Sequence, residues 1–121
     1  MNPSREQIEA QLIQSFNEAA EKLNTEGPVM IGDGVRRERT EVGPGLNITY
    51  FISLRNFAST DIDVFDFQSS LITELRENVC KSKEMIPALK FGAGYSYVYT
   101  GTDDVEVARV TIRKHDCPEL N

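Results

Sequence analysis

Hydrophobic residues recur at helical spacing in two stretches of the chain, residues 4–24 and residues 64–80. The first stretch begins with Ser4 and Gln7, a pair typical of a capping box at a helix N-terminus. The second begins after Asp63, a residue type that caps helices. The apolar positions are Ile8, Leu12, Phe16, Ala19, Ala20 and Leu23 in the first stretch and Val64, Phe67, Leu71, Leu75 and Val79 in the second. The pattern predicts two amphipathic helices, each with one face buried against another layer.

Alternation of apolar and polar residues predicts strands in the remaining segments. It is clearest over residues 46–54, where every second residue is apolar. The other predicted strands are residues 29–31, 35–42, a segment opened by Gly92 and Gly94, and 105–113. The charged residues in 35–42 are typical of an exposed or edge strand. The loop 101–104 is expected to join the last two strands as a hairpin. Pro87 interrupts the second helix, so a short helical turn over 85–89 is expected.

The order of these elements is helix, three strands, helix, two strands. Strands joined by short connections favour an antiparallel sheet with helices on one face. We therefore expect an α+β fold, in which an antiparallel sheet of four to five strands packs against the N-terminal helix and the second helix. A chain of 121 residues is about the size of one domain, so residues 1–121 are expected to form a single domain.

Composition supports a packed core, because 40% of the residues are hydrophobic and 26% are charged. The net charge of −6 argues against a nucleic-acid partner, which would require clustered positive charge. No apolar run reaches the length of a membrane span, and no signal-peptide core is present.

Cys80 and Cys117 are the two cysteines of the chain, and they do not form a Cys-x-x-Cys redox motif. Cys80 falls at the end of the second predicted helix, and Cys117 lies just beyond the last predicted strand. We favour a structural disulfide, which would stabilise the fold by roughly 4 kcal/mol on the chain-entropy model. Two buried free thiols and a reactive cysteine remain open as alternatives.

The sequence offers no recognisable catalytic or metal-binding set. His115 and Cys117 form the only pair that resembles metal ligands, and two ligands do not complete a zinc site. The aspartates 61, 63 and 66 lack the glycine and glutamate of a calcium loop, so helix capping explains them better. No segment supplies a nucleophile, a base and an oxyanion donor together. We expect no catalytic residues, no metal and no cofactor.

Two segments are candidates for binding. Tyr95, Tyr97 and Tyr99 alternate along one predicted strand and therefore share one face, and Tyr50 is expected to lie across from them. Tyrosine combines a large apolar ring with a polar tip, which suits a ligand groove or a protein interface. The alternative is an aromatic ladder covered by the first helix.

The second candidate segment carries Arg36, Arg37 and Arg39, which could bind an anion or an acidic partner. Interleaved Glu38 and Glu41 favour the simpler interpretation of a solvated strand.

Several short segments, taken in order, resemble a group of small exported bacterial proteins of uncharacterised function, of the type called quorum-sensing-regulated virulence factors. The segments are Pro28 to Ile31 with Val35 and Arg36, Gly43 to Gly45, Leu46 to Leu54, Cys80, Gly94 to Tyr99, and Cys117. The resemblance covers residues 4–117 and implies export, a disulfide between Cys80 and Cys117 and an α+β fold, and it implies no reaction. A weaker likeness, in element order and disulfide, is to the small periplasmic pilotins that escort secretion channels.

These observations lead to two hypotheses. The first is an exported, non-enzymatic domain, periplasmic or secreted, that binds a protein or peptide partner in secretion or virulence; Met1 would then be an initiator before the mature sequence. The alternative is a small-ligand carrier or enzyme with a pocket between the sheet and the first helix. A deep pocket lined by Tyr50, Tyr97 and buried carboxylates would favour the alternative, and a filled core would favour the partner-binding domain.

Overall fold

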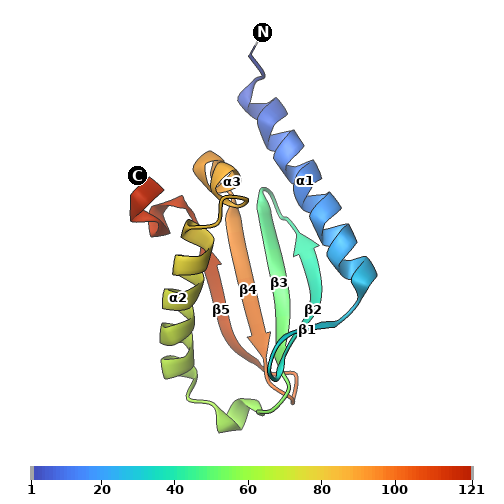
Figure 1. Cartoon of the computed structure of the whole chain (residues 1–121), viewed down its shortest axis with the longest axis vertical. Coiled ribbons are helices and arrows are strands. Elements are labelled where there is room, and N and C mark those ends of the chain that lie inside the picture. Colours follow the sequence, from blue (N-terminus) through green and yellow to red (C-terminus); the bar gives the residue numbers. More distant parts are fainter. Residues whose placement is uncertain (1, 121) are drawn as a thin grey trace.

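The computed structural model describes residues 2–120, in which two long helices lie along opposite margins of a sheet (Figure 1). The predicted helices and strands all form, with bounds within two residues of those expected. In chain order the elements are α1 (Arg5–Glu26), β1 (Val29–Gly32), β2 (Val35–Val42), β3 (Asn47–Leu54), η1 (Ser59–Asp61), α2 (Val64–Cys80), α3 (Ile86–Phe91), β4 (Gly94–Thr100), β5 (Glu106–Ile112), η2 (Lys114–Asp116) and η3 (Pro118–Leu120).

Side-chain caps explain why the long helices begin where the sequence predicts. The Ser4 hydroxyl accepts a hydrogen bond from the Gln7 N–H at 3.1 Å, and the Gln7 side chain accepts one from the Ser4 N–H at 2.7 Å. At the start of α2, the Asp63 carboxylate accepts a hydrogen bond from the Asp66 N–H at 3.1 Å. These contacts satisfy donors that have no partner within the helix. The predicted capping box and N-cap are confirmed.

The five strands lie side by side in chain order, from β1 at one edge to β5 at the other. Neighbouring strands are antiparallel except β3 and β4, which are parallel. The α+β fold, with a five-stranded sheet, an N-terminal helix and a second helix, is confirmed, but the sheet is mixed where an antiparallel one was expected. The reason is the connection between β3 and β4: α2 and α3 carry the chain back to the end of the sheet at which β3 begins, so β4 runs in the same direction as β3 (Figure 1).

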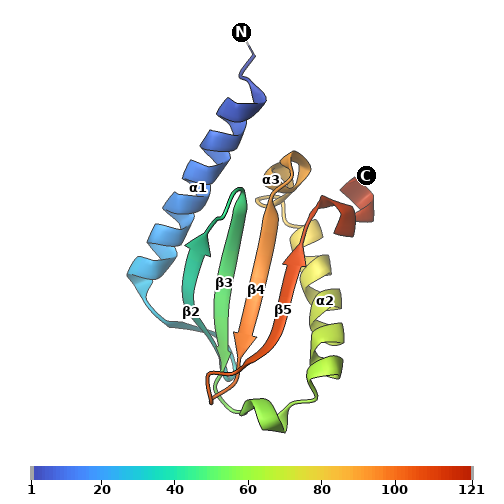
Figure 2. The ribbon, with the colours of Figure 1, turned by 180° about the vertical axis from the view of Figure 1, so that it is seen from behind.

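The helices cover one face of the sheet and leave the other face uncovered by helices, as the view from behind shows (Figure 2). Phe16 of α1 contacts Tyr95 edge-to-face, with ring centroids 5.5 Å apart, and Phe67 of α2 contacts Tyr99 in the same way at 5.7 Å. Because Tyr95 and Tyr99 share one face of β4, α1 and α2 lie on the same side. Leu12 also packs against this core, so the expected packing of the first helix is confirmed.

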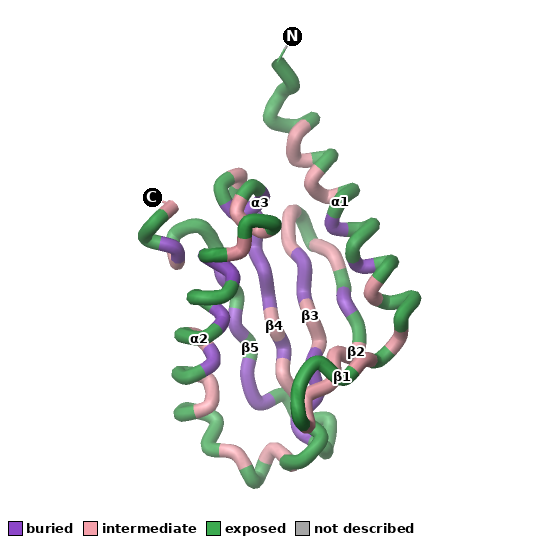
Figure 3. The backbone as a smooth tube through the Cα atoms, viewed as in Figure 1, coloured by how far each residue is buried: buried purple, intermediate pink, exposed green. Residues whose placement is uncertain are grey.

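The core lies between this sheet face and the inner sides of the helices, where the backbone is coloured as buried (Figure 3). Its most completely buried side chains are Ile48, Val79, Leu89, Ile112 and Cys117. Among residues 2–120, none of the helices has the length and apolar character needed to cross a membrane.

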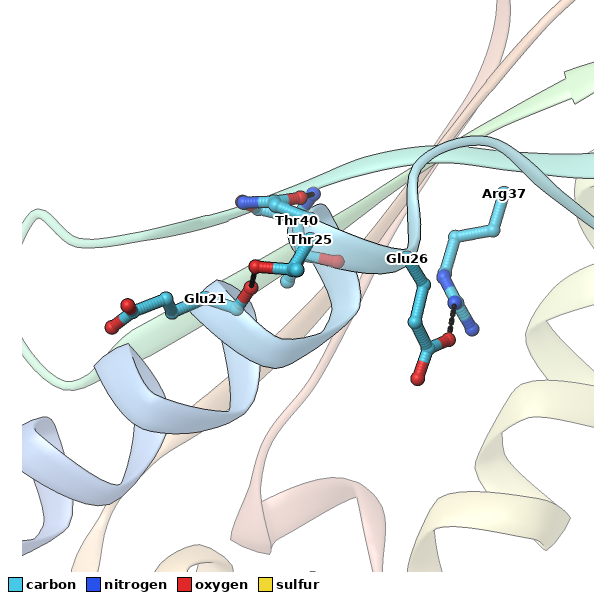
Figure 4. A network of polar contacts seen from close by, with 6 residues as sticks. Glu21, Thr25, Glu26, Arg37 and Thr40 are labelled. Atoms are coloured by element: carbon cyan, nitrogen blue, oxygen red, sulfur yellow. Dashed lines mark hydrogen bonds and ion pairs between the residues drawn. The ribbon is translucent and has the colours of Figure 1, made fainter.

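β2 is an inner strand over its first half, which corrects the expectation of an edge strand. β1 pairs with it from Val35 to Arg37. Beyond β1, the side-chain amide of Asn24 takes the place of a neighbouring strand: it donates to the Thr40 carbonyl and accepts from the Thr40 N–H, both at 2.8 Å. The last turn of α1 is also held by Thr25, whose hydroxyl donates to the Glu21 carbonyl at 2.8 Å (Figure 4). The pattern of charges in β2 did not indicate the Asn24 contacts, because they come from a different element, α1.

A disulfide joins Cys80, the last residue of α2, to Cys117, and the two Cα atoms are 5.3 Å apart. Both cysteines are buried. The predicted disulfide is confirmed, and it fastens the C-terminal segment to the end of α2. The alternatives of free thiols and of a reactive cysteine are thereby ruled out for this state of the protein.

Candidate functional site

The tyrosine row occupies the sheet between the two long helices. Tyr50 of β3 lies opposite Tyr97 of β4, and their rings stack with centroids 5.1 Å apart. Tyr95 is covered by Phe16 and is 4% exposed, whereas Tyr50, Tyr97 and Tyr99 are half-buried. The prediction that the four rings share a face and that Tyr50 lies across from the row therefore agrees with the geometry, and only Tyr95 belongs fully to the core.

Hollows flank the stacked pair at both ends of the row. The first, of about 340 Å³, lies where Tyr95 begins the row, between α1 and the segment before α3. It is lined by Leu12, Ser15, Phe16, Ala19, Ile48, Tyr50, Glu84, Met85, Pro87, Ala88 and Tyr95. The second, also about 340 Å³, lies at Tyr99 between the β1–β2 hairpin and α2. It is lined by Ile31, Gly32, Val35, Leu54, Phe67, Leu71, Glu74 and Tyr99.

The two hollows and the stacked pair of Tyr50 and Tyr97 between them form one strip of surface, which we call the tyrosine furrow. Its walls come from α1, which packs on β2 and β3, and from α2, which packs on β5. The two helices lie along opposite margins of the sheet in both ribbon views, with β3 and β4 between them (Figures 1 and 2).

The tyrosine hydroxyls of the furrow are neutral and available. Burial raises the pKa of Tyr95 to about 12, and burial also raises the pKa of Tyr97 and of Tyr50, although the charge of Arg37 opposes the shift at Tyr50. Burial, reinforced by Glu74, raises the pKa of Tyr99. None of the four hydroxyls forms a hydrogen bond with another residue of the 2–120 range, and none of them is a buried unpartnered atom.

The furrow therefore presents apolar rings with free hydroxyl donors that are neutral at neutral pH. Such a surface suits the binding of a polypeptide, whose backbone carbonyls accept hydrogen bonds while its side chains contact the rings. It does not suit nucleophilic or acid–base chemistry, because phenols with raised pKa values do not ionise readily.

The three candidate arginines do not form one patch. Arg37 faces the furrow side and lies 3.2 Å from the Glu26 carboxylate (Figure 4). Arg36 and Arg39 lie on the helix-free face, because the strand register shifts between Arg37 and Arg39. Each has its own acidic neighbour: Arg36 Nε is 2.6 Å from Glu38, and Arg39 Nε is 2.7 Å from Glu41. The three arginines are therefore divided between the two faces of the sheet.

His115 is exposed, lies 3.6 Å from Asp116 and lines neither hollow of the furrow. Cys117, two residues after His115, is in the disulfide, so His115 and Cys117 cannot act as a nucleophile pair. In the described part of the chain, no group of three or more His, Cys, Asp or Glu side chains is placed to hold a metal ion.

Sequence reasoning missed the walls of the furrow. Ser15 and Ala19 of α1 line the first hollow. The helical spacing of apolar residues identified Ala19 only as an apolar position, and it did not identify Ser15. Glu84 and Met85 line it from the opposite side. No local signal marks such residues, because whether a helix position faces a hollow or open solvent depends on where the neighbouring elements pack.

Comparison with known proteins gives likenesses in fold. No protein-family model matches this sequence, and no curated protein matches it. Among solved structures, a Pseudomonas aeruginosa protein inferred to be secreted superimposes with a TM-score of 0.73 at 18% identity, over 97% of this chain and 99% of that one.

Two pilotins of type II secretion systems share the fold as well. AspS from Vibrio cholerae matches with a TM-score of 0.67 at 17% identity, and EpsS from Vibrio vulnificus with 0.68 at 12%. Each covers 90% of this chain and 94% of its own. The resemblance to small exported bacterial proteins and to pilotins is thus confirmed, and at these identities it shows the fold.

Proposed function

We propose that this chain is an exported, non-enzymatic protein that binds a segment of a protein partner from a secretion apparatus in the tyrosine furrow. The observation that carries the proposal is the stacked Tyr50–Tyr97 pair, which lies half-buried between two hollows with its hydroxyls unpaired. Aromatic residues with polar tips are enriched in protein interfaces, where they provide contact area and hydrogen bonds at little entropic cost.

The alternative of a small-ligand carrier or enzyme with a pocket between the sheet and α1 has less support. The buried polar residues in the described part of the chain are Thr40, Thr49, Ser53 and Ser96, so no carboxylate is buried beneath the first hollow. A catalytic site usually contains titratable groups whose pKa values are matched to the reaction. Among the described residues that line the furrow, the phenols have pKa values raised by burial and the two carboxylates, Glu74 and Glu84, are exposed, which favours binding over catalysis.

Export and a role in secretion have separate support. Disulfides persist in oxidising compartments such as the bacterial periplasm, and this chain has its two cysteines in one disulfide. The proteins that share its fold include two pilotins of type II secretion systems and a protein inferred to be secreted.

Site-specific photo-crosslinking in the native host tests the proposal. A photoreactive amino acid replaces Ala19, which is exposed on α1 and lines the furrow, or Ala10, which is exposed on α1 outside it. The expected result is a crosslinked adduct from position 19 and little from position 10, and mass spectrometry of the adduct should identify a component of a secretion apparatus. The additional change Tyr97→Leu, in a chain shown to fold by its unfolding curve, should reduce the yield of adduct.

Each part of the proposal can fail separately. Equal yields from the two positions, or no adduct from position 19, would exclude the furrow as the binding site. A position-specific adduct with a protein unrelated to secretion would retain the furrow and exclude the secretion partner.

A further inference from the structure

A cavity of about 480 Å³ lies on the helix-free face of the sheet, opposite the furrow. Phe51 and Val98 of the two central strands form its floor, and they are the neighbours in sequence of Tyr50 and Tyr97. The cavity is lined by Arg36, Glu38, Arg39, Phe51, Ile52, Ser53, Arg55, Val98, Thr100, Asp104 and Glu106. We call it the arginine pocket. Its volume falls within the range of small-molecule sites.

The register shift in β2 builds one wall of this pocket. Arg36 pairs with Ser53 and Arg39 pairs with Phe51, so both arginines lie above the same face of β3 even though they are three positions apart. Without the extra residue, the alternation of the strand would place them on opposite faces. Arg55 follows the end of β3 and completes the wall.

The arginines are held in place while keeping donors available. Arg36 and Arg39 engage Glu38 and Glu41 through Nε, which leaves their terminal amino groups for a ligand. The Arg39 guanidinium also stacks 3.9 Å above the Phe51 ring. The Arg55 side chain forms no hydrogen bond or ion pair with any residue of the 2–120 range, although its backbone N–H donates to the Gly34 carbonyl at 2.7 Å.

Glu38 is the anchor of this arrangement. It accepts hydrogen bonds from Arg36 and from the Ser53 hydroxyl. Burial opposes its ionisation, but these hydrogen bonds and the charges of Arg36 and Arg55 lower the pKa of its carboxyl below the ordinary value. Glu38 therefore stays charged and neutralises part of the wall, so the wall suits one carboxylate better than a multiply charged anion such as phosphate.

The opposite wall carries the opposite charge. Glu106 is occupied by Arg109, whose two nitrogens lie 2.8 and 3.2 Å from its carboxylate oxygens. Asp104 has no ion pair within the described residues. Unpaired Arg55 and unpaired Asp104 therefore face the same cavity from its two sides, which is the charge arrangement that a zwitterion complements.

The size and floor of the pocket select the length and type of the zwitterion. Arg55 directly follows β3, and Asp104 lies just before β5. These two strands are two strand spacings apart, so the charged residues are separated by about 10 Å. An extended peptide spans about 3.5 Å per residue, so two or three residues bridge that distance. Phe51 and Val98 offer apolar contact, and the Thr100 hydroxyl has no partner among residues 2–120.

We propose that the arginine pocket binds a short apolar peptide of two or three residues with free termini. Its carboxylate contacts Arg55 together with Arg36 and Arg39, and its ammonium group contacts Asp104. This site lies on the face opposite the furrow and does not depend on the function proposed there.

Titration of the full-length, disulfide-bonded protein with L-leucyl-L-leucine tests the site by amide chemical shifts. Two matched probes each lack one charge: N-acetyl-L-leucyl-L-leucine lacks the ammonium group, and L-leucyl-L-leucinamide lacks the carboxylate. The dipeptide should shift amides around Phe51, Ser53 and Thr100, while amides around Tyr97 on the furrow side change less. The acetylated probe should bind more weakly, and the amide probe should not bind at concentrations of about 10 mM.

Variants assign each end of the ligand. Arg55→Gln should weaken binding of the dipeptide about tenfold, the loss expected for one charge-assisted hydrogen bond. Asp104→Asn should reduce binding of the dipeptide to the level of the acetylated probe. Arg76→Gln, which changes an exposed arginine on α2 away from the pocket, is the control and should leave binding unchanged.

Three outcomes would overturn the proposal. The first is the absence of any shift with the dipeptide at about 10 mM, and the second is equal binding of the amide probe. The third is unchanged affinity in Arg55→Gln when its spectrum shows a folded protein.

Discussion

Asn24 offers the sharpest test of how α1 is attached to the sheet. Its side-chain amide forms two hydrogen bonds with the backbone of Thr40, where no strand covers β2. Asn24→Ala removes both bonds and leaves the backbone groups of Thr40 without a partner. The substitution therefore separates the attachment of the helix from the apolar packing around Phe16, which it does not touch.

The magnitude follows from the burial of Thr40, which is 2% exposed. A buried backbone group left without a partner costs about 1–3 kcal/mol, and Asn24→Ala leaves two such groups. Alanine is the better helix former, which offsets about 0.5 kcal/mol. We expect the free energy of unfolding to fall by about 3 kcal/mol, with part of the loss recovered if water enters beside β2.

Urea unfolding with the disulfide intact measures this change, and hydrogen exchange at the Thr40 amide locates it. Asn17→Ala, an exposed asparagine on the same helix, is the matched control and should change stability by less than about 0.5 kcal/mol. Thr40→Val should be neutral or stabilising, because the Thr40 hydroxyl is buried without a partner. A loss below about 1 kcal/mol in Asn24→Ala, with the Thr40 amide still protected from exchange, would refute the reasoning.

Three further predictions concern the disulfide, the core and the tyrosines. Cys117→Ser should lower the free energy of unfolding by about 2–5 kcal/mol, and an unchanged urea midpoint would contradict a stabilising disulfide. Phe16→Ala should lower it by about 3–5 kcal/mol in the same assay, since Phe16 is 7% exposed and packs on Tyr95; a chain without residues 1–24 that still unfolded cooperatively would show that α1 is dispensable. Burial raises the pKa of Tyr95 to about 12 from an ordinary value of 10.0, so the neutral ring contributes stability below pH 10 that is lost as the pH rises toward 12. Ultraviolet absorbance should show tyrosines of the folded protein ionising above pH 10, and titration of all four at their ordinary pKa would exclude a buried row.

The sequence predicted those parts of the fold that have local signals. Apolar spacing placed α1 and α2, and the caps at Ser4 and Asp63 fixed where they begin. The direction of β4 had no such signal, because alternation identifies the residues of a strand and not the orientation of its neighbour. The register shift after Arg37 was equally hidden, since neither a glycine nor a proline marks it. That shift places Arg39 on the face of Arg36, whereas plain alternation would have placed it on the face of Arg37.

The sequence also predicted only part of the candidate site. Alternation placed the four tyrosines on one face, but it could not distinguish Tyr95, which Phe16 covers, from Tyr97, which lies between the helices. The difference in burial between Tyr95 and Tyr97 depends on where α1 lies on the sheet. Contacts of Asn24 and of the core determine that position, and the sequence of the strand does not. Arg55 was not identified as a binding residue because in the sequence it is a single charged residue at the end of a strand, and its significance comes only from lining the same cavity as Asp104.

The parallel pairing of β3 and β4 determines both surfaces of the sheet. It sets Tyr50 opposite Tyr97 on one face, and it sets Phe51 opposite Val98 and Ser53 opposite Thr100 on the other. An antiparallel neighbour would keep the tyrosines on their face but would reverse their order, so that different residues would meet on both sides. The crossover through α2 and α3 enforces the parallel direction. The two helices of this connection supply a wall of the furrow and no residue of the arginine pocket, yet the composition of both sites depends on the connection.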